Sequence, residues 1–84
     1  MRVEFYGVSR QRSGVAERHV TARTLGELLG ALAAEYPSLG ELISENRLHP
    51  ALTANLNGDR FVRDPHTPLG EHDCVLILSA DAGG

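Results

Sequence analysis

The sequence contains no lysine, a single cysteine and no long apolar run, and each of these absences narrows what the 84-residue chain can be. One cysteine cannot form an internal disulfide, so the composition does not point to an oxidising compartment. No apolar run approaches the ~18 residues that a membrane span needs. The N-terminus MRVEFYGVSR also lacks the apolar core of a signal peptide. We therefore expect a cytoplasmic protein with no membrane partner.

Basic residues are also fewer than acidic ones: 8 arginines stand against 11 aspartates and glutamates, so the formal net charge is −3 at pH 7. Nucleic-acid-binding proteins usually carry a basic excess, so nucleic acid is not an expected partner. The arginines concentrated in residues 1–24 fit a solvated basic rim better than a phosphate-binding patch. Because every basic residue is arginine, the chain offers no side-chain amine to an activated acyl group.

The length and the composition predict one folded domain. The chain is too short for two cores, and its 42% apolar and 23% charged residues are ordinary for a globular domain. We expect residues 1–78 to form this domain and residues 79–84 to form a flexible C-terminal tail.

The first quarter of the chain has the pattern of a β-hairpin. Apolar and polar residues alternate over residues 3–8, which predicts a strand. The polar segment QRSG (11–14) ends in glycine and predicts a turn. Residues 15–22 then predict a second strand, antiparallel to the first.

The next segment predicts the main helix. TLGE (24–27) is a capping box, in which the threonine hydroxyl and the glutamate carboxylate satisfy backbone N–H groups at a helix start. Apolar residues at helical spacing follow from Leu25 to Tyr36, and Pro37 ends the pattern. Two glycines, Gly26 and Gly30, weaken the helix and are expected to allow its close approach to a sheet.

The middle of the chain predicts a second, short helical turn and another hairpin. SLGE (38–41) repeats the capping-box pattern. ALTANL (51–56) and DRFVR (59–63) predict two strands, and the intervening Asn57-Gly58 is a strong hairpin-turn signal.

The last segment completes the fold prediction. Residues 64–73 contain two prolines and predict a loop, whereas CVLIL (74–78) is apolar at every position and predicts a core strand. Two initial strands, a main helix and returning strands are typical of an α+β roll of the β-grasp (ubiquitin-like) type. We expect a mixed sheet of four to five strands, with the helix across one face and the last strand beside the first.

The sequence ends with SADAGG (79–84), directly after the predicted core strand. Gly83 and Gly84 leave the terminal carboxylate without a branched neighbour and leave the backbone free to follow a narrow channel. Such a carboxylate suits activation by ATP to an acyl adenylate, followed by attack of a sulfur nucleophile.

The whole chain resembles the MoaD/ThiS family of ubiquitin-like sulfur carriers and is most similar, in length and pattern, to the small subunit of molybdopterin synthase. The similar segments are VEFYGVSR, TLGELLGALAAEYPSL, ANLNG and, most specifically, LGEHDCVLILSADAGG. The resemblance differs at Ser79-Ala80, where molybdopterin-type carriers usually have two prolines, so it leaves the pathway open and implies a looser tail.

The resemblance implies a carrier that is not itself an enzyme and binds no cofactor. A ubiquitin-activating-type adenylyltransferase would use ATP to adenylate Gly84, which Gly83 precedes. A sulfurtransferase would supply sulfur for a thiocarboxylate, and the molybdopterin synthase large subunit or another sulfur-accepting enzyme would receive it. Asp73 matches the aspartate before the family's last strand, where we expect it to hold the turn.

Partner binding is assigned to the tail and to one face of the sheet. Leu76 and Leu78 share a strand face, and if that face points away from the helix they form an apolar patch with Phe61. The alternation alone leaves the choice of face open, and burial under the loop is the competing interpretation. The expected partner-binding residues are Phe61, Leu76, Leu78, Ser79, Ala80, Asp81 and Ala82.

Two other site chemistries match the sequence poorly. Cys74 and His72 would lie on one side of a strand as nucleophile and base, but no third group is evident to orient the histidine. A structural cysteine is therefore favoured. His66, His72 and Cys74 match no four-ligand zinc spacing, so no metal site is predicted.

Other functions remain open beside the molybdopterin carrier. One alternative is a sulfur carrier for cysteine synthesis, thiamine synthesis or tRNA thiolation. Another is a ubiquitin-like protein modifier, in which Gly84 forms an isopeptide bond to a target lysine. A plain β-grasp interaction module is the third class. Deletion of Gly83 and Gly84 separates this module from the others, because only the module would keep working.

Overall fold

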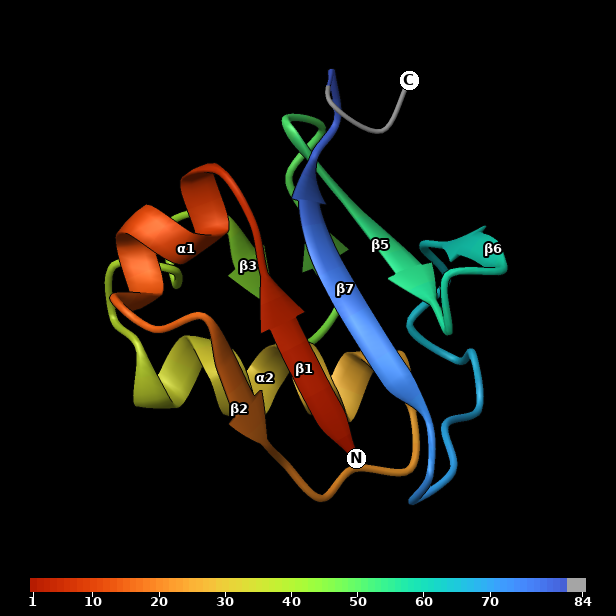
Figure 1. Cartoon of the computed structure of the whole chain (residues 1–84). Coiled ribbons are helices and arrows are strands. Elements are labelled where there is room, and N and C mark those ends of the chain that lie inside the picture. Colours follow the sequence, from red (N-terminus) through yellow and green to blue (C-terminus); the bar gives the residue numbers. More distant parts are fainter. Residues whose placement is uncertain (82–84) are drawn as a thin grey trace.

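The computed structural model describes residues 1–81 and shows a five-stranded sheet in the order β2-β1-β7-β5-β6, with one long helix behind it (Figure 1). The central pair, β1 (Arg2–Phe5) and β7 (Cys74–Ser79), is parallel. The other neighbouring strands are antiparallel. The predicted α+β mixed sheet of the β-grasp type, with the last strand beside the first, is confirmed.

The main helix is α2 (Leu25–Glu35), and its start follows the predicted capping box. The Thr24 hydroxyl accepts the Glu27 N–H at 3.2 Å, and the Glu27 carboxylate accepts the N–H of Arg23 at 3.1 Å. The helix ends at Glu35, just before Tyr36, whose ring packs edge-on against Phe5 with centroids 5.9 Å apart. The local signals therefore place both ends of this helix correctly.

The core lies between α2 and the near face of the sheet. The leucines of the helix meet alternate residues of the three central strands, as the strand period of two requires. The central members of this core are at most 1% exposed: Val3, Phe5, Leu25, Leu28, Leu29, Leu32, Leu52, Ala54, Val75 and Ile77.

The connection between the first two strands was wrongly predicted as a hairpin turn. Instead, residues 8–13 form a short helix, α1 (Val8–Ser13), and β2 shortens to Glu17–His19. Gly14 has φ 78° and donates its N–H to the Arg10 carbonyl, so it caps the end of a helix. The fully buried Ser9 hydroxyl lies 2.9 Å from the Ile77 carbonyl and ties this helix to β7.

The predicted short helical turn at 38–41 is present only as isolated turns and does not form a helix. That segment forms hydrogen-bonded turns, which lead into a two-stranded hairpin of β3 (Ile43–Ser44) and β4 (Arg47–Leu48). Leu39 and Ile43 are buried in the core, at 0% and 2% exposure. Burial of these two side chains against the rest of the molecule overrides the local capping pattern.

Gly26 allows a close approach, but its neighbours are loops and not the five-stranded sheet. A Cβ atom at Gly26 would lie 2.7 Å from the Glu45 carbonyl oxygen and 3.2 Å from Pro65. Gly30 faces the same residue, Glu45, at an ordinary 3.5 Å. The expectation about the sheet was therefore wrong.

The hairpin of β5 (Leu52–Leu56) and β6 (Arg60–Val62) is as predicted. Asn57 and Gly58 have φ 60° and 71°, the positive values that a tight hairpin turn requires. The structural role of Asp73 is also confirmed. Its carboxylate accepts the Asn57 amide at 2.9 Å and the Gly70 N–H at 2.7 Å.

The core strand is one residue longer than predicted. Strand β7 continues past Leu78 to Ser79, and the Ala80 N–H donates to the Ala51 carbonyl at 2.8 Å. The expected flexibility of the tail stays a prediction. Residues 82–84 lie outside the described part of the chain. Within residues 1–81, no helix is long and apolar enough to cross a membrane.

Candidate functional site

The sheet face away from α2, called the outer face below, carries the predicted patch. Val75 and Ile77 point into the core, at 0% and 1% exposure, so alternation turns Leu76 and Leu78 to the outer face. Both leucines are half-buried there. The choice that the sequence left open is thus decided in favour of an outward Leu76 and Leu78.

The strands on one side of β7 extend this surface. Directly paired residues share a face, so Thr53 lies beside Leu78 and Asn55 beside Leu76. Phe61 of β6 lies opposite Asn55 and is 56% exposed, more than any other large apolar side chain described. Leu76, Leu78 and Phe61, called the apolar patch below, therefore share the outer face as predicted, with Asn55 between Leu76 and Phe61.

Asn55 is a polar group that the sequence analysis missed. Its side chain is only 9% exposed, and its buried Oδ1 atom has no hydrogen-bond partner among the described residues. Leaving a buried acceptor unpaired costs about 1–3 kcal/mol. The only sequence signal is the position of Asn55 within the predicted strand 51–56, and the register that sets it beside Leu76 comes from the structure.

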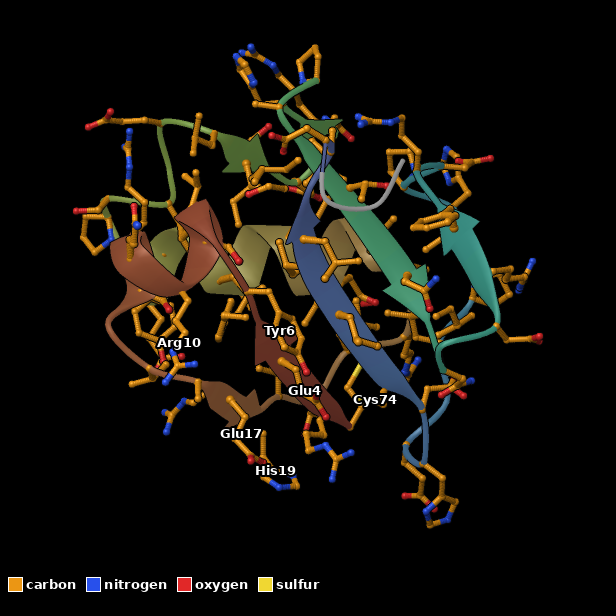
Figure 2. The ribbon with its side chains drawn as sticks, turned by 45° about the horizontal axis from the view of Figure 1, so that its top comes forward. Glu4, Tyr6, Arg10, Glu17, His19 and Cys74 are labelled. Carbon is orange, nitrogen blue, oxygen red and sulfur yellow. The ribbon has the colours of Figure 1, made fainter. Side chains whose placement is uncertain are left out.

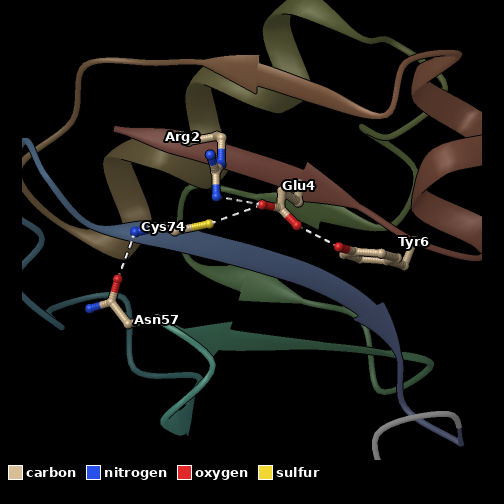
Figure 3. Close-up of polar contacts among 5 residues, drawn as sticks. All are labelled: Arg2, Glu4, Tyr6, Asn57 and Cys74. Carbon is tan, nitrogen blue, oxygen red and sulfur yellow. Dashed lines mark hydrogen bonds and ion pairs between the residues drawn. The ribbon is translucent and has the colours of Figure 1, made fainter.

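The other half of the outer face is polar and is built around Glu4 of β1. Figure 2 shows Glu4, Tyr6 and Cys74 on the same face as Glu17 and His19 of β2. The Glu4 carboxylate accepts hydrogen bonds from the Tyr6 hydroxyl, from the Arg2 guanidinium at 2.9 Å and from the Cys74 thiol at 3.5 Å (Figure 3).

These contacts keep Glu4 charged. The Tyr6 hydrogen bond is the main reason that the pKa of Glu4 lies below its ordinary value, and the neighbouring Arg2 acts in the same direction. The outer face thus combines an apolar patch over β7 and β6 with a neutralised ion pair over β1.

The geometry separates Cys74 from His72. The His72 side chain is 94% exposed and lies 3.3 Å from Glu71, whereas the Cys74 thiol donates to Glu4. Burial raises the pKa of the Cys74 thiol, and the nearby Glu4 charge raises it further, so the thiol form is favoured at neutral pH. The two side chains are therefore not arranged as a nucleophile and its base. Among residues 1–81, no group of three or more histidine, cysteine or acidic residues is placed to hold a metal ion.

The root of the tail, Ser79 and Ala80, lies at the end of β7 between two other segments. The Ser79 hydroxyl accepts the Val8 N–H of α1 at 3.4 Å, and the Ala51 carbonyl accepts the Ala80 N–H. Gly7 makes room for this contact, because a Cβ there would lie 2.5 Å from the Ser79 hydroxyl.

The remaining predicted tail residues stand as follows. Asp81 is exposed. Ala82, Gly83 and Gly84, including the predicted site of chemistry, lie outside the described residues, so their roles stay predictions.

Comparison of the sequence with protein-family models and with curated proteins finds no match. Solved structures do match, over 99% of this chain in the three cases that follow. SAMP1 (small archaeal modifier protein 1) from Haloferax volcanii has a TM-score of 0.79 at 17% identity, over 97% of its chain. The Haloferax volcanii HVO 2177 protein has a TM-score of 0.77 at 28% identity, over 84% of its chain. In the Amycolatopsis orientalis BexX/CysO complex, the matching chain has a TM-score of 0.78 at 22% identity, over 98% of its length. These likenesses show that the chain shares the β-grasp fold of these proteins.

Proposed function

We propose that the protein is a ubiquitin-like sulfur carrier, whose Gly84 carboxylate is converted to a thiocarboxylate by partner enzymes. The observation that carries this proposal is the direct passage from the central strand β7, through the anchored Ala80, into the sequence Asp-Ala-Gly-Gly. The shared fold with the modifier SAMP1 and with CysO, which was solved together with BexX, supports it. The chain itself acts as a co-substrate and not as an enzyme.

The proposed chemistry needs only a reachable carboxylate on this chain. A carboxylate oxygen of Gly84 attacks the α-phosphorus of ATP, and pyrophosphate leaves. Hydrosulfide or the terminal sulfur of a sulfurtransferase persulfide then attacks the acyl carbon, and AMP leaves. Hydrosulfide gives the thiocarboxylate directly, after loss of its proton. A persulfide gives an acyl disulfide, and a second thiol cleaves its S–S bond, which releases the thiocarboxylate and leaves a disulfide on the partner. An activated acyl group also reacts with amines, and the absence of lysine removes every side-chain amine that could consume it within the same molecule. The adenylating enzyme, a sulfurtransferase and a sulfur-accepting enzyme are the partners that this sequence of steps requires.

The outer face is the proposed docking surface for the adenylating enzyme. Binding of the body would raise the local concentration of the tail at the ATP site. Docking would bury the apolar patch and remove it from water. The unpaired Oδ1 atom of Asn55 could then accept a hydrogen bond from a donor of the partner. Because both features lie on one face, a single partner surface can cover both.

Replacing Leu76 tests this docking surface. Leu76→Asp places a charge in the apolar patch and removes a side chain worth about 1.5–3 kcal/mol when buried, so the KM for the carrier should rise about 10- to 100-fold. Ala31→Asp is the matched control, because Ala31 is an exposed apolar residue of α2, which covers the opposite side of the sheet. Equal KM values for the two variants would contradict docking on the outer face.

Intact mass spectrometry tests the function itself. The protein is incubated with ATP, a sulfur source and the adenylating enzymes of its organism. Exchange of one oxygen for sulfur adds about 16 Da, and this gain should be absent from the variant that lacks Gly83 and Gly84. The unreacted mass also tests whether Gly84 is the terminal residue of the cellular protein, which the proposal requires. No gain with any adenylating enzyme would overturn it.

The acceptor of the sulfur is the finer part of the proposal. The sequence resemblance favours molybdopterin synthesis, with the large subunit of the synthase as acceptor, over cysteine synthesis, thiamine synthesis and tRNA thiolation. The fold shared with the modifier SAMP1 favours a second function, attachment of Gly84 to lysines of other proteins. A mass gain of sulfur on the free protein supports the carrier, whereas covalent conjugates in cell extract support the modifier.

A further inference from the structure

Arg63 makes an unusual pair of bonds just after β6. Its guanidinium donates one hydrogen bond to the Leu48 carbonyl and another to the Leu52 carbonyl, both at 2.6 Å and both partly buried. These carbonyls lie at the two ends of the connection between β4 and β5. In Figure 1 this green connection lies beside the upper end of β7. Arg63 thus links the two ends of the segment Leu48–Leu52.

The segment Leu48–Leu52 also contains internal hydrogen bonds. The Leu52 N–H donates to the His49 carbonyl at 2.8 Å, and the Ala51 N–H donates to the His49 ring at 2.9 Å. These bonds give the short segment a defined shape. The register of β5 with β7, in which Leu52 lies opposite Ser79, sets the Ala51 carbonyl opposite Ala80, whose N–H it accepts at 2.8 Å. A chain of contacts therefore runs from Arg63, through the segment, to the first residue after β7.

We propose that Arg63 is a positioning residue, which sets the point and the direction in which the C-terminal tail leaves the body. It acts through the segment Leu48–Leu52, whose ends it binds and whose Ala51 carbonyl accepts the Ala80 N–H. Arginine suits this task because its planar guanidinium presents several N–H donors at fixed angles, and a charged donor strengthens each bond to a carbonyl. Lysine carries a single flexible ammonium group and cannot reproduce the planar fork.

The functional consequence rests on the proposed sulfur-carrier function. If the adenylating enzyme binds the outer face, the position of Ala80 relative to that face determines where the Gly84 carboxylate arrives. A loosely held root spreads the carboxylate over a larger volume and lowers its effective concentration at the ATP site. The turnover number of activation should fall, whereas the affinity for the body should not, because the docking surface is unchanged.

The first experiment measures amide hydrogen exchange by NMR in the whole protein. In Arg63→Ala, the Ala80 N–H should exchange about tenfold faster or more, because the segment that holds it opens locally. The Tyr6 N–H, bonded to the Ile77 carbonyl at 3.0 Å within the central sheet, should be unchanged. Arg63→Lys, which keeps the aliphatic stem and one charge, should lie between the wild type and Arg63→Ala. Arg47→Ala is the matched control, since the described structure shows no hydrogen bond or ion pair of the Arg47 side chain.

The second experiment measures ATP–pyrophosphate exchange with the adenylating enzyme that activates the wild-type protein. We expect the kcat of Arg63→Ala to fall about tenfold with KM changed less than about twofold. Arg63→Lys should recover part of the kcat. A residue that only stabilises the fold would not produce this split, provided that the assay is run well below the unfolding temperature of each variant.

The results separate the possibilities. Unchanged exchange at Ala80 in Arg63→Ala overturns the proposal, as does equal acceleration at Ala80 and Tyr6, which would make Arg63 a general stabiliser. Faster exchange at Ala80 with a wild-type kcat overturns its functional part. If no adenylating enzyme acts on the wild type, the proposed function fails, and the exchange data alone decide whether Arg63 holds the tail root. If Arg63→Ala does not fold, Arg63→Lys supplies both readouts.

Discussion

Alanine at two glycines of α2 should change stability in opposite directions. Gly26 and Gly30 lie one helical turn apart and both face the β3–β4 hairpin around Glu45. At Gly30, a Cβ would lie 3.5 Å from the Cβ of Glu45, which is an ordinary contact. Because alanine in a helix interior is more favourable than glycine by about 0.8–1.0 kcal/mol, Gly30→Ala should stabilise the protein by nearly that amount.

At Gly26 the same substitution meets backbone. The added Cβ would lie 2.7 Å from the Glu45 carbonyl oxygen and 3.2 Å from both the Cβ and the carbonyl oxygen of Pro65. The helix cannot simply move away, because the Gly26 N–H is bonded to the Pro65 carbonyl at 2.9 Å. Forced overpacking typically costs about 1–3 kcal/mol, and the gain in helix propensity offsets part of it. We expect a net loss of about 1–2 kcal/mol for Gly26→Ala.

Thermal unfolding followed by circular dichroism measures both variants against the wild type. For a domain of this size, 1 kcal/mol shifts the melting temperature by about 4–8 °C, so the two variants should lie clearly on opposite sides of the wild type. Both substitutions lie far from the outer face, so the KM for activation should stay unchanged. If Gly26→Ala proves as stable as Gly30→Ala, the β3–β4 hairpin can move to accommodate the added Cβ at little cost, and the steric reasoning is refuted.

Two further predictions concern titrating groups. The Asn57 amide and the Gly70 N–H lower the pKa of Asp73, so its ionised form stabilises the fold above about pH 4, and this contribution disappears as the pH falls through the folded-state pKa. Asp73→Asn should therefore lower the free energy of unfolding by about 1 kcal/mol at neutral pH. In acid unfolding curves the difference from the wild type should shrink toward about pH 2, and a constant difference would contradict the assignment. Because burial raises the pKa of Cys74, iodoacetamide should alkylate it slowly at neutral pH, with a rate still rising above about pH 9. Glu4→Gln removes the adjacent negative charge and should shift that profile to lower pH, so superimposable profiles would exclude a role for Glu4.

The sequence and the structure disagree where one local signal has two meanings. Gly14 needs a positive φ both in a hairpin turn and at the end of a helix, so the residue by itself does not distinguish these structures. The distinction comes from Ser9, whose hydroxyl reaches the Ile77 carbonyl, 68 residues away in the chain. The capping pattern at 38–41 failed for a related reason, since burial of Leu39 and Ile43 outweighed it.

The candidate site shows the same division. Alternation along β7 limited Leu76 and Leu78 to one shared face, and the sequence leaves two choices for that face. Only the packing of Val75 and Ile77 against α2 decided between them. The Oδ1 atom of Asn55 is buried and unpaired because β6 and β7 flank its strand on both sides. The residue pattern of a single strand does not show which strands will flank it.

By itself, the sequence determined the main helix with its capping box, the Asn57-Gly58 turn and the central strand, because the preferences that form them act within a few neighbouring residues. The tertiary structure alone decided which face is free and what holds the tail root. Arg63 binds the backbone carbonyls of Leu48 and Leu52. Because every residue has a backbone carbonyl, the sequence does not indicate which carbonyls a given arginine will bind. Only the folded chain brings these groups to hydrogen-bonding distance.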